Sequence, residues 1–84
     1  MDQQALHLGV QAVFRRVFDR EELVTRDDMT AKDIPDWDSL AQINLVVGAE
    51  EAFGVRFQTA EIRALKNVGE FKQLIARKLA AQGR

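Results

Sequence analysis

Asp38, Ser39 and Leu40 form the part of the sequence best suited to chemistry. A mainly apolar run over residues 41–47 follows directly and predicts a helix that begins at Ser39. A serine in the first turn of a helix has three possible roles. It caps the helix, it acts as a nucleophile, or it carries an attached anionic group.

A catalytic serine needs a general base within hydrogen-bond reach, and that base usually needs an orienting group. The only histidine, His7, lies in the first predicted helix and outside any recognisable motif. The residues around Ser39 do not form the Gly-x-Ser-x-Gly elbow of serine hydrolases. We therefore expect no catalytic residue and no enzymatic activity from this chain alone.

Two interpretations of Ser39 stay open on spacing alone. Serine and aspartate both cap helices, because their side-chain oxygens accept hydrogen bonds from unpaired backbone N–H groups, and Asp36 or Asp38 would serve equally well. Alternatively, the positive end of the helix dipole favours a phosphate ester on Ser39. The hydroxyl group would there be exposed to a modifying enzyme.

The segments around this serine are predicted to be helical. Apolar residues recur at helical spacing over residues 3–18 and 39–53, and Gly54 suits the left-handed position that follows a helix. Thr59 is expected to cap a short third helix, and Asn67 to open a fourth through a capping box. Strand-like alternation is almost absent.

A long acidic stretch separates the first two helices. Residues 19–35 lack sustained periodicity and include one expected short turn at Thr30, which Pro35 stops. We predict an all-α fold in one domain over residues 1–84, a four-helix bundle with a long loop between helices 1 and 2 and a short helix 3. The apolar side expected on the second helix comprises Leu40, Ile43, Val46, Val47 and Phe53, with Ala49 filling the gap.

Composition excludes several kinds of site. The 84 residues include no cysteine and one histidine, so we expect no disulfide and no metal site. The acids at positions 27, 28 and 33 lack the spacing of a calcium loop. No apolar run approaches the roughly 20 residues of a membrane span, and no secretory signal is recognisable. We expect a soluble, cytoplasmic monomer.

Charge is distributed unevenly along the chain. Residues 1–55 contain eleven acids and five bases, whereas residues 56–84 contain two acids and seven bases. Because residues 35–55 hold four acids and no base, we expect a positively charged partner near Ser39. The basic C-terminal part has no aromatic-rich motif, and we expect no binding of nucleic acid.

These features together resemble the acyl carrier protein family, over nearly the whole chain. The resemblance implies that Ser39 is esterified with 4′-phosphopantetheine donated by coenzyme A. The chain would then be a carrier that holds acyl or aminoacyl intermediates as thioesters, in fatty acid, polyketide or nonribosomal peptide biosynthesis. The matching residues are Asp38, Ser39, Leu40, Ile43, Leu45, Val46, Glu50, Glu51, Phe53, Gly54, Val55 and Phe57.

The resemblance also implies partners and further site residues. A phosphopantetheinyl transferase would attach the arm, a ligase would load an acyl or aminoacyl group, and a downstream synthase or transferase would use it. Asp38 is expected to help present Ser39 to the transferase, with capping as its alternative role. Leu40 is expected to contact the transferase from the exposed first turn, with core packing as its alternative role. Partner or cargo contacts, or simple packing, are expected from Trp37, Ile43, Val46, Val47, Phe57 and Ile62.

Two features depart from the commonest pattern of fatty-acid synthesis. Ala41, Gln42 and Asn44 are neutral where carriers of that pathway usually have acids, which indicates a different set of partner enzymes. Trp37 before the motif is similar to stand-alone carriers of specialised pathways, such as polyketide, nonribosomal peptide or modified-sugar assembly. The open alternative is an unmodified helical module that binds another protein.

Overall fold

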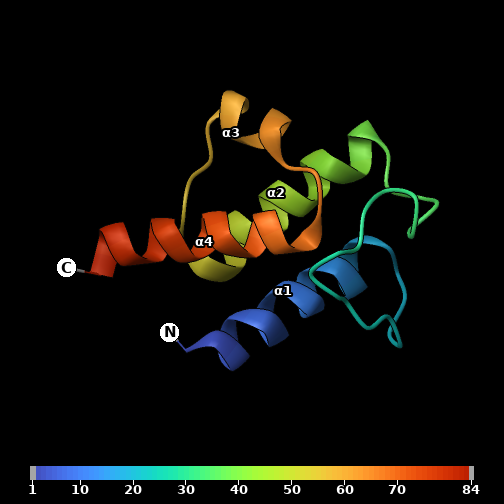
Figure 1. Ribbon diagram of the computed structural model, residues 1–84, viewed down its shortest axis with the longest axis horizontal. Helices are drawn as coiled ribbons and strands as arrows, with labels where there is room; N and C mark the ends of the chain where they lie inside the picture. Colours follow the sequence, from blue (N-terminus) through green and yellow to red (C-terminus); the bar gives the residue numbers. More distant parts are fainter. Residues whose placement is uncertain (1, 84) are drawn as a thin grey trace.

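The computed structural model describes residues 2–83, and this part of the chain contains four helices and no strand (Figure 1). The long helices α1, α2 and α4 pack against one another, and the short α3 lies beside them. This confirms the all-α fold with a long first loop and a short third helix. The helices are α1 (Gln3–Val17), α2 (Ser39–Phe53), α3 (Thr59–Ala64) and α4 (Val68–Gly83).

Local signals fix most of the helix ends. Asp2 caps α1, since its Oδ1 accepts a hydrogen bond from the Ala5 N–H at 2.7 Å. Gly54 ends α2 with a φ of 68°, the left-handed conformation predicted for it. The short turn at Thr30 is also present, because the Asp33 N–H donates to the Thr30 carbonyl at 2.9 Å.

Two predicted caps need correction. Gln58, not Thr59, is the N-cap of α3, and its N–H donates to the Glu61 carboxylate at 2.8 Å. Asn67 does cap α4, since its Oδ1 accepts from the Glu70 N–H at 2.8 Å. The Glu70 carboxylate, however, accepts from the Lys66 N–H at 2.9 Å, so the reciprocal half of the expected box is shifted by one residue.

The core lies between α1, α2 and α4, and the long loop contributes to it. Met29 and Ile34 of that loop are buried. The loop is also held by backbone hydrogen bonds, because Val68 and Gly69 at the start of α4 donate to carbonyls of residues 29 and 27. The buried core cluster comprises Leu6, Val10, Val13, Phe14, Phe18, Met29, Ile34, Ala41, Leu45, Ala49, Val68, Phe71 and Ile75.

The apolar side predicted for α2 is wrong at Leu40, Ile43 and Val47, whereas Val46 and Ala49 are buried and Phe53 packs against the core. Leu40, Ile43 and Val47 are 66%, 56% and 46% exposed, and the buried residues of α2 are Ala41, Leu45, Val46, Gly48 and Ala49. Because α2 is apolar on almost every side, its sequence pattern does not identify the buried face. Contact with α1 identifies the buried face. Helix α1 comes so close to Gly48 that a β-carbon added there would lie 3.0 Å from Val13 Cγ1.

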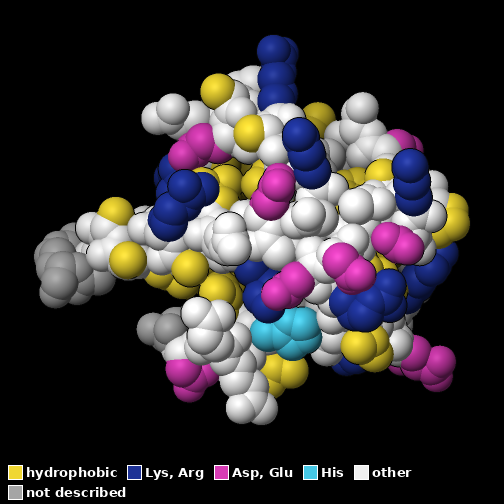
Figure 2. All heavy atoms as spheres, viewed as in Figure 1, with side chains coloured by type: hydrophobic (Ala, Val, Ile, Leu, Met, Phe, Trp, Pro, Cys, Tyr) yellow, Lys and Arg dark blue, Asp and Glu magenta, His cyan; other side chains and the backbone are white. Residues whose placement is uncertain are grey.

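The visible face of the molecule mixes charges of both signs (Figure 2). Both lysines of α4 pair with acids of other segments, Lys72 with Asp27 at 2.8 Å and Lys78 with Glu61 at 2.7 Å. Because these lysines are paired with acids, they contribute less to the positive potential that would attract the phosphate backbone of a nucleic acid. Within residues 2–83, none of the helices combines the length and apolar character needed to cross a membrane.

Candidate functional site

Ser39 is the first residue of α2, and its side chain is exposed. The cap of this helix is the preceding Asp38, whose Oδ1 accepts a hydrogen bond from the Ala41 N–H at 2.8 Å. The Asp38 carbonyl accepts from the Gln42 N–H at 2.9 Å and begins the helical ladder. Asp38 is therefore the cap of α2, and the Ser39 hydroxyl does not serve as the cap.

The possible general base lies elsewhere. His7 belongs to the N-terminal half of α1. Its Nδ1 lies 3.3 Å from Lys72 Nζ, so the ring belongs to a polar cluster between α1 and α4. This position argues against a histidine-activated Ser39 nucleophile.

Trp37 is held firmly at the junction between the long loop and α2. Its half-buried ring meets Phe14 edge-on at 5.3 Å between centroids, and Phe18 at 6.4 Å. Its Nε1 donates a 2.7 Å hydrogen bond to Gln42 Oε1. Gln42 Nε2 in turn donates to the Ile62 carbonyl of α3 at 3.2 Å. Trp37 thus covers the junction and also orients a side chain that links α2 to α3.

An exposed apolar row runs along α2 beside Ser39. Leu40, Ile43 and Val47 are spaced three and four residues apart, so they lie along one side of the helix. Their exposed apolar surface is available to a partner that covers it. Leu40 is therefore not a core residue, and the alternative of core packing is wrong for Ile43 and Val47 as well.

The other predicted contact residues are not gathered at one site. Val46 is buried and lines, together with Trp37, a narrow apolar gap that is too small to hold a water molecule. Phe57 packs on Phe71, with ring centroids 5.9 Å apart, and Ile62 is half-buried on α3. The structure brings together Trp37 and Val46, places Ile43 and Val47 outside, and leaves Phe57 near α4.

Two acids near the site have partners that the sequence did not indicate. Arg20, in the loop just after α1, has its Nη2 3.5 Å from Asp36 Oδ2, so a base does reach the loop before Ser39. Glu50 is not a freely solvated acid, because its Oε2 accepts from the Phe57 N–H at 3.0 Å. The first contact joins residues 16 apart in the sequence and the second joins residues 7 apart, so neither follows from the three- or four-residue spacing of a helical turn.

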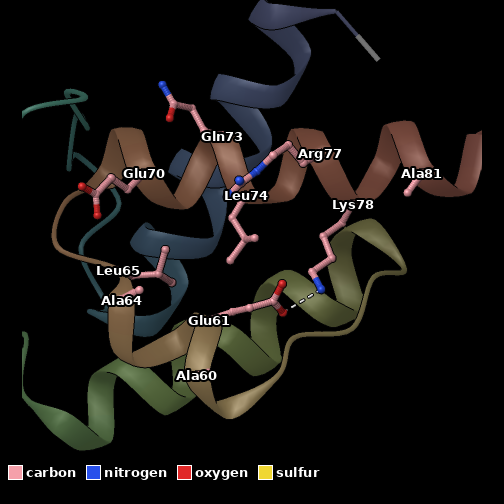
Figure 3. Close-up of a pocket in the computed structure, with 10 residues that line it drawn as sticks. All are labelled: Ala60, Glu61, Ala64, Leu65, Glu70, Gln73, Leu74, Arg77, Lys78 and Ala81. Carbon is pink, nitrogen blue, oxygen red and sulfur yellow. Dashed lines mark ion pairs between the residues drawn. The ribbon is translucent and has the colours of Figure 1, made fainter.

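A separate open groove lies between α3 and α4, and Ser39 is not part of it (Figure 3). Glu61 and Lys78 point toward each other across it and form the ion pair at 2.7 Å. The hydrogen bond from Lys78, followed by the one from the Gln58 N–H, lowers the pKa of Glu61. Among the described residues, no group of three acids or histidines is arranged to hold a metal ion.

The comparisons with known proteins agree with this geometry. No family model matches the chain. It is 42% identical over 55 residues to an acyl carrier protein of Arthrobacter sp. strain FB24, covering 66% of this chain and 67% of that protein. The chain belongs to the acyl carrier protein family. An acyl carrier protein of Acidothermus cellulolyticus is 49% identical over 41 residues, which is 49% of each chain.

A solved structure extends the likeness to the whole fold. The solution NMR structure of holo acyl carrier protein from Geobacter metallireducens has a TM-score of 0.85 and 36% sequence identity. The match covers 92% of this chain and 88% of that one. As a member of this family, the protein is a carrier and not an enzyme.

Proposed function

We propose that the protein carries acyl or aminoacyl intermediates as thioesters on a 4′-phosphopantetheine arm attached to Ser39. The main observation in support is that Ser39 is exposed at the start of α2, and that Asp38 rather than Ser39 caps this helix. When attached, the arm supplies a thiol, which the cysteine-free chain itself lacks. Family membership and the holo relative support the same assignment.

The residues present suit this prosthetic group. The first turn of α2 directs backbone N–H groups and the positive end of its dipole toward the Ser39 side, which favours a phosphodiester there. Asp38 uses one carboxylate oxygen for the Ala41 N–H and so keeps this turn ordered. Exposure of Ser39 gives a modifying enzyme access to the hydroxyl.

The proposed partners are a phosphopantetheinyl transferase, a loading ligase and a downstream synthase or transferase. They would meet the exposed row of Leu40, Ile43 and Val47 beside the arm. Because Gln42 and Asn44 add no charge to this helix, we expect these partners to rely on apolar contact more than on basic patches. The identity of these partners would determine the cargo and the pathway.

Intact-mass measurement tests the attachment. The protein is incubated with coenzyme A, Mg²⁺ and a promiscuous phosphopantetheinyl transferase, and the mass should rise by one arm. Ser39 is the only serine, so Ser39→Ala should abolish the gain. Thr59→Ala is the matched control, because Thr59 is also an exposed hydroxyl residue that begins a helix, and it should be modified normally.

Two outcomes would contradict the proposal. A mass gain that persists in Ser39→Ala would place the arm elsewhere, and no gain in any variant would exclude it. Protein isolated from its native cell with an unmodified Ser39 would favour the alternative, a helical module that binds a partner through the exposed row on α2.

A further inference from the structure

The open groove between α3 and α4, which we call the α3–α4 groove, is a surface that the proposed attachment at Ser39 does not use (Figure 3). It has a volume of about 720 Å³, which is within the size range of protein binding sites. Among the described residues, α3, α4 and Leu65 between them line it, and α2 contributes none of the lining. The groove is therefore separate from the exposed row on α2.

The shape of the α3–α4 groove suits a helix. Lining positions recur every three or four residues over residues 70–81, so the groove follows one side of α4 for about 16 Å, or three turns. Leu65 and Leu74 point into the space between the two helices and provide apolar surface (Figure 3). The exposed lining residues with small side chains are Ala60, Ala64 and Ala81. Because these alanines leave room beside the leucines, a partner helix of about three turns fits along α4.

The two acids of the groove are already engaged. Glu61 pairs with Lys78 at 2.7 Å. Glu70 accepts a hydrogen bond from the Lys66 N–H at 2.9 Å, and Lys66 carries a positive charge of its own. Each acid thus has a lysine beside it, and neither presents an unbalanced negative charge to a partner.

Two arginines provide a positive excess. Arg77 is exposed and lines the groove, and Arg63 is exposed and adjoins the lining residue Ala64. Within residues 2–83, neither arginine forms an ion pair. An exposed guanidinium group without an ion-pair partner favours a partner that carries carboxylates.

This excess is opposite in sign to the charge around Ser39. Residues 35–55 hold four acids and no base, whereas residues 59–83 hold two acids and five bases. A partner surface that is complementary to one of these regions in charge is repelled by the other. The charge distribution therefore indicates two different partner surfaces.

We propose that the α3–α4 groove is a docking site for an acidic amphipathic helix of a second partner protein. The apolar side of that helix would cover Leu65 and Leu74, and its carboxylates would pair with Arg63 and Arg77. Since the groove shares no residue with the exposed row on α2, the Ser39 side stays available while the helix is bound. Anchoring of this kind raises the effective concentration of a carrier near the enzymes that it serves.

The lining favours a protein over a nucleic acid. A phosphate chain binds along a row of cations, but here leucines and the carboxylates of Glu61 and Glu70 lie among the cations. An amphipathic helix can place apolar residues opposite the leucines and polar residues opposite the carboxylates. Nucleic-acid binding is therefore the competing outcome of the experiment.

The experiment titrates four ligands into the complete, isotope-labelled chain. Three are peptides of about twelve residues, long enough for three helical turns. The first has a leucine face flanked by glutamates, the second has lysines in place of the glutamates, and the third has alanines in place of the leucines. The fourth ligand is a single-stranded DNA oligonucleotide. Backbone amide chemical shifts, recorded by NMR, report where each ligand binds and how tightly.

The acidic leucine peptide should bind most tightly, with its shifts in α3 and along residues 70–81. Arg63→Glu and Arg77→Glu should each weaken its binding about tenfold, since an exposed ion pair contributes up to about fivefold and charge reversal adds repulsion of similar size. Arg16→Glu makes the same change at an exposed arginine of α1 outside the groove, and should stay within about twofold of wild type. Unchanged circular dichroism spectra would show that the variants fold.

The independence of the two surfaces is measured with the same peptide. Ser39→Ala should bind it as tightly as wild type, and saturating peptide should leave the rate of arm attachment unchanged. The inference does not rest on the arm. If wild type accepts no arm, the proposed function fails, whereas peptide binding still decides the role of the groove.

Several outcomes would overturn the inference. Absence of binding by the acidic leucine peptide, or shifts confined to α2, would exclude the groove. Equal binding by the lysine or alanine peptide would show that neither the arginines nor the leucines select a partner, and equal binding by the oligonucleotide would indicate a phosphate site instead. Equal losses in Arg16→Glu and Arg77→Glu would reduce the effect to overall charge. Slower arm attachment with peptide bound would show that the two surfaces overlap.

Discussion

Replacing Asp38 separates its capping role from its charge. The Asp38 carboxylate accepts from the Ala41 N–H at 2.8 Å at the beginning of α2. Asparagine caps a helix about as well as aspartate, whereas alanine has no acceptor. We therefore expect Asp38→Ala to lose about 1 kcal/mol of unfolding free energy, and Asp38→Asn to lose only the charge–dipole contribution, about 0.3 kcal/mol at an exposed position.

The two variants should differ visibly in thermal unfolding. For a domain of this size, about 1 kcal/mol corresponds to about 4–8 °C in melting temperature. Far-UV circular dichroism, recorded during heating and during urea titration, measures both quantities. The rate of arm attachment to Ser39 should follow the same order, since an ordered first turn presents the hydroxyl. Asp38→Asn should therefore stay within about twofold of wild type, equivalent to about 0.4 kcal/mol.

A specific result would refute this reasoning. If Asp38→Asn destabilises the protein as much as Asp38→Ala, the hydrogen bond to Ala41 is not the source of the stabilisation. If Asp38→Asn keeps its stability but loses arm attachment, the carboxylate charge itself is recognised by the transferase. Capping would then be the lesser role of Asp38.

Three further predictions concern the fold. Leu45→Ala should cost about 2–5 kcal/mol because Leu45 is 1% exposed, whereas Leu40→Ala on the same helix should stay within about 0.5 kcal/mol, both measured by urea unfolding. Gly54→Ala should cost about 1 kcal/mol in the same assay, because its φ is 68°. Lys78 lowers the pKa of Glu61 below its usual 4.5, so the stabilisation is present above pH 4.5 and decreases as the pH falls further. Wild type and Glu61→Gln should therefore differ in urea midpoint at pH 7 and converge in acid.

Each of these has a clear contrary result. Equal losses at positions 40 and 45 would mean that α2 is rotated about its axis relative to this structure. An unchanged stability in Gly54→Ala would mean that the end of α2 adopts another conformation. If the urea midpoints of wild type and Glu61→Gln differ by the same amount at every pH, ionisation of Glu61 is not the source of the stabilisation.

Sequence patterns failed where several faces of a helix are equally apolar. Helix α2 carries apolar residues around most of its circumference, so periodicity did not identify its inner face. Its orientation follows from α1, which approaches closely enough at Gly48 that a β-carbon would touch Val13. The same close approach explains why a glycine occupies the middle of this helix.

The candidate site was only partly predictable for a similar reason. The sequence indicated Ser39 and, with it, a helix capped by an acid. It did not indicate that Gln42 bridges Trp37 to α3, since Gln42 and the Ile62 carbonyl are twenty residues apart. Nor did it indicate that Arg20 reaches Asp36. Such contacts arise from packing, which no short pattern encodes.

The sequence by itself determined the helices, their approximate ends and the exposed serine at the start of α2. These depend on interactions within three or four residues, such as the Asp38 cap and the left-handed Gly54, so residue type and spacing suffice. The tertiary structure alone decided which side of α2 is exposed and how closely the interior beside Ser39 is packed. Both depend on how distant segments fill the same space, because close packing leaves each helix one orientation.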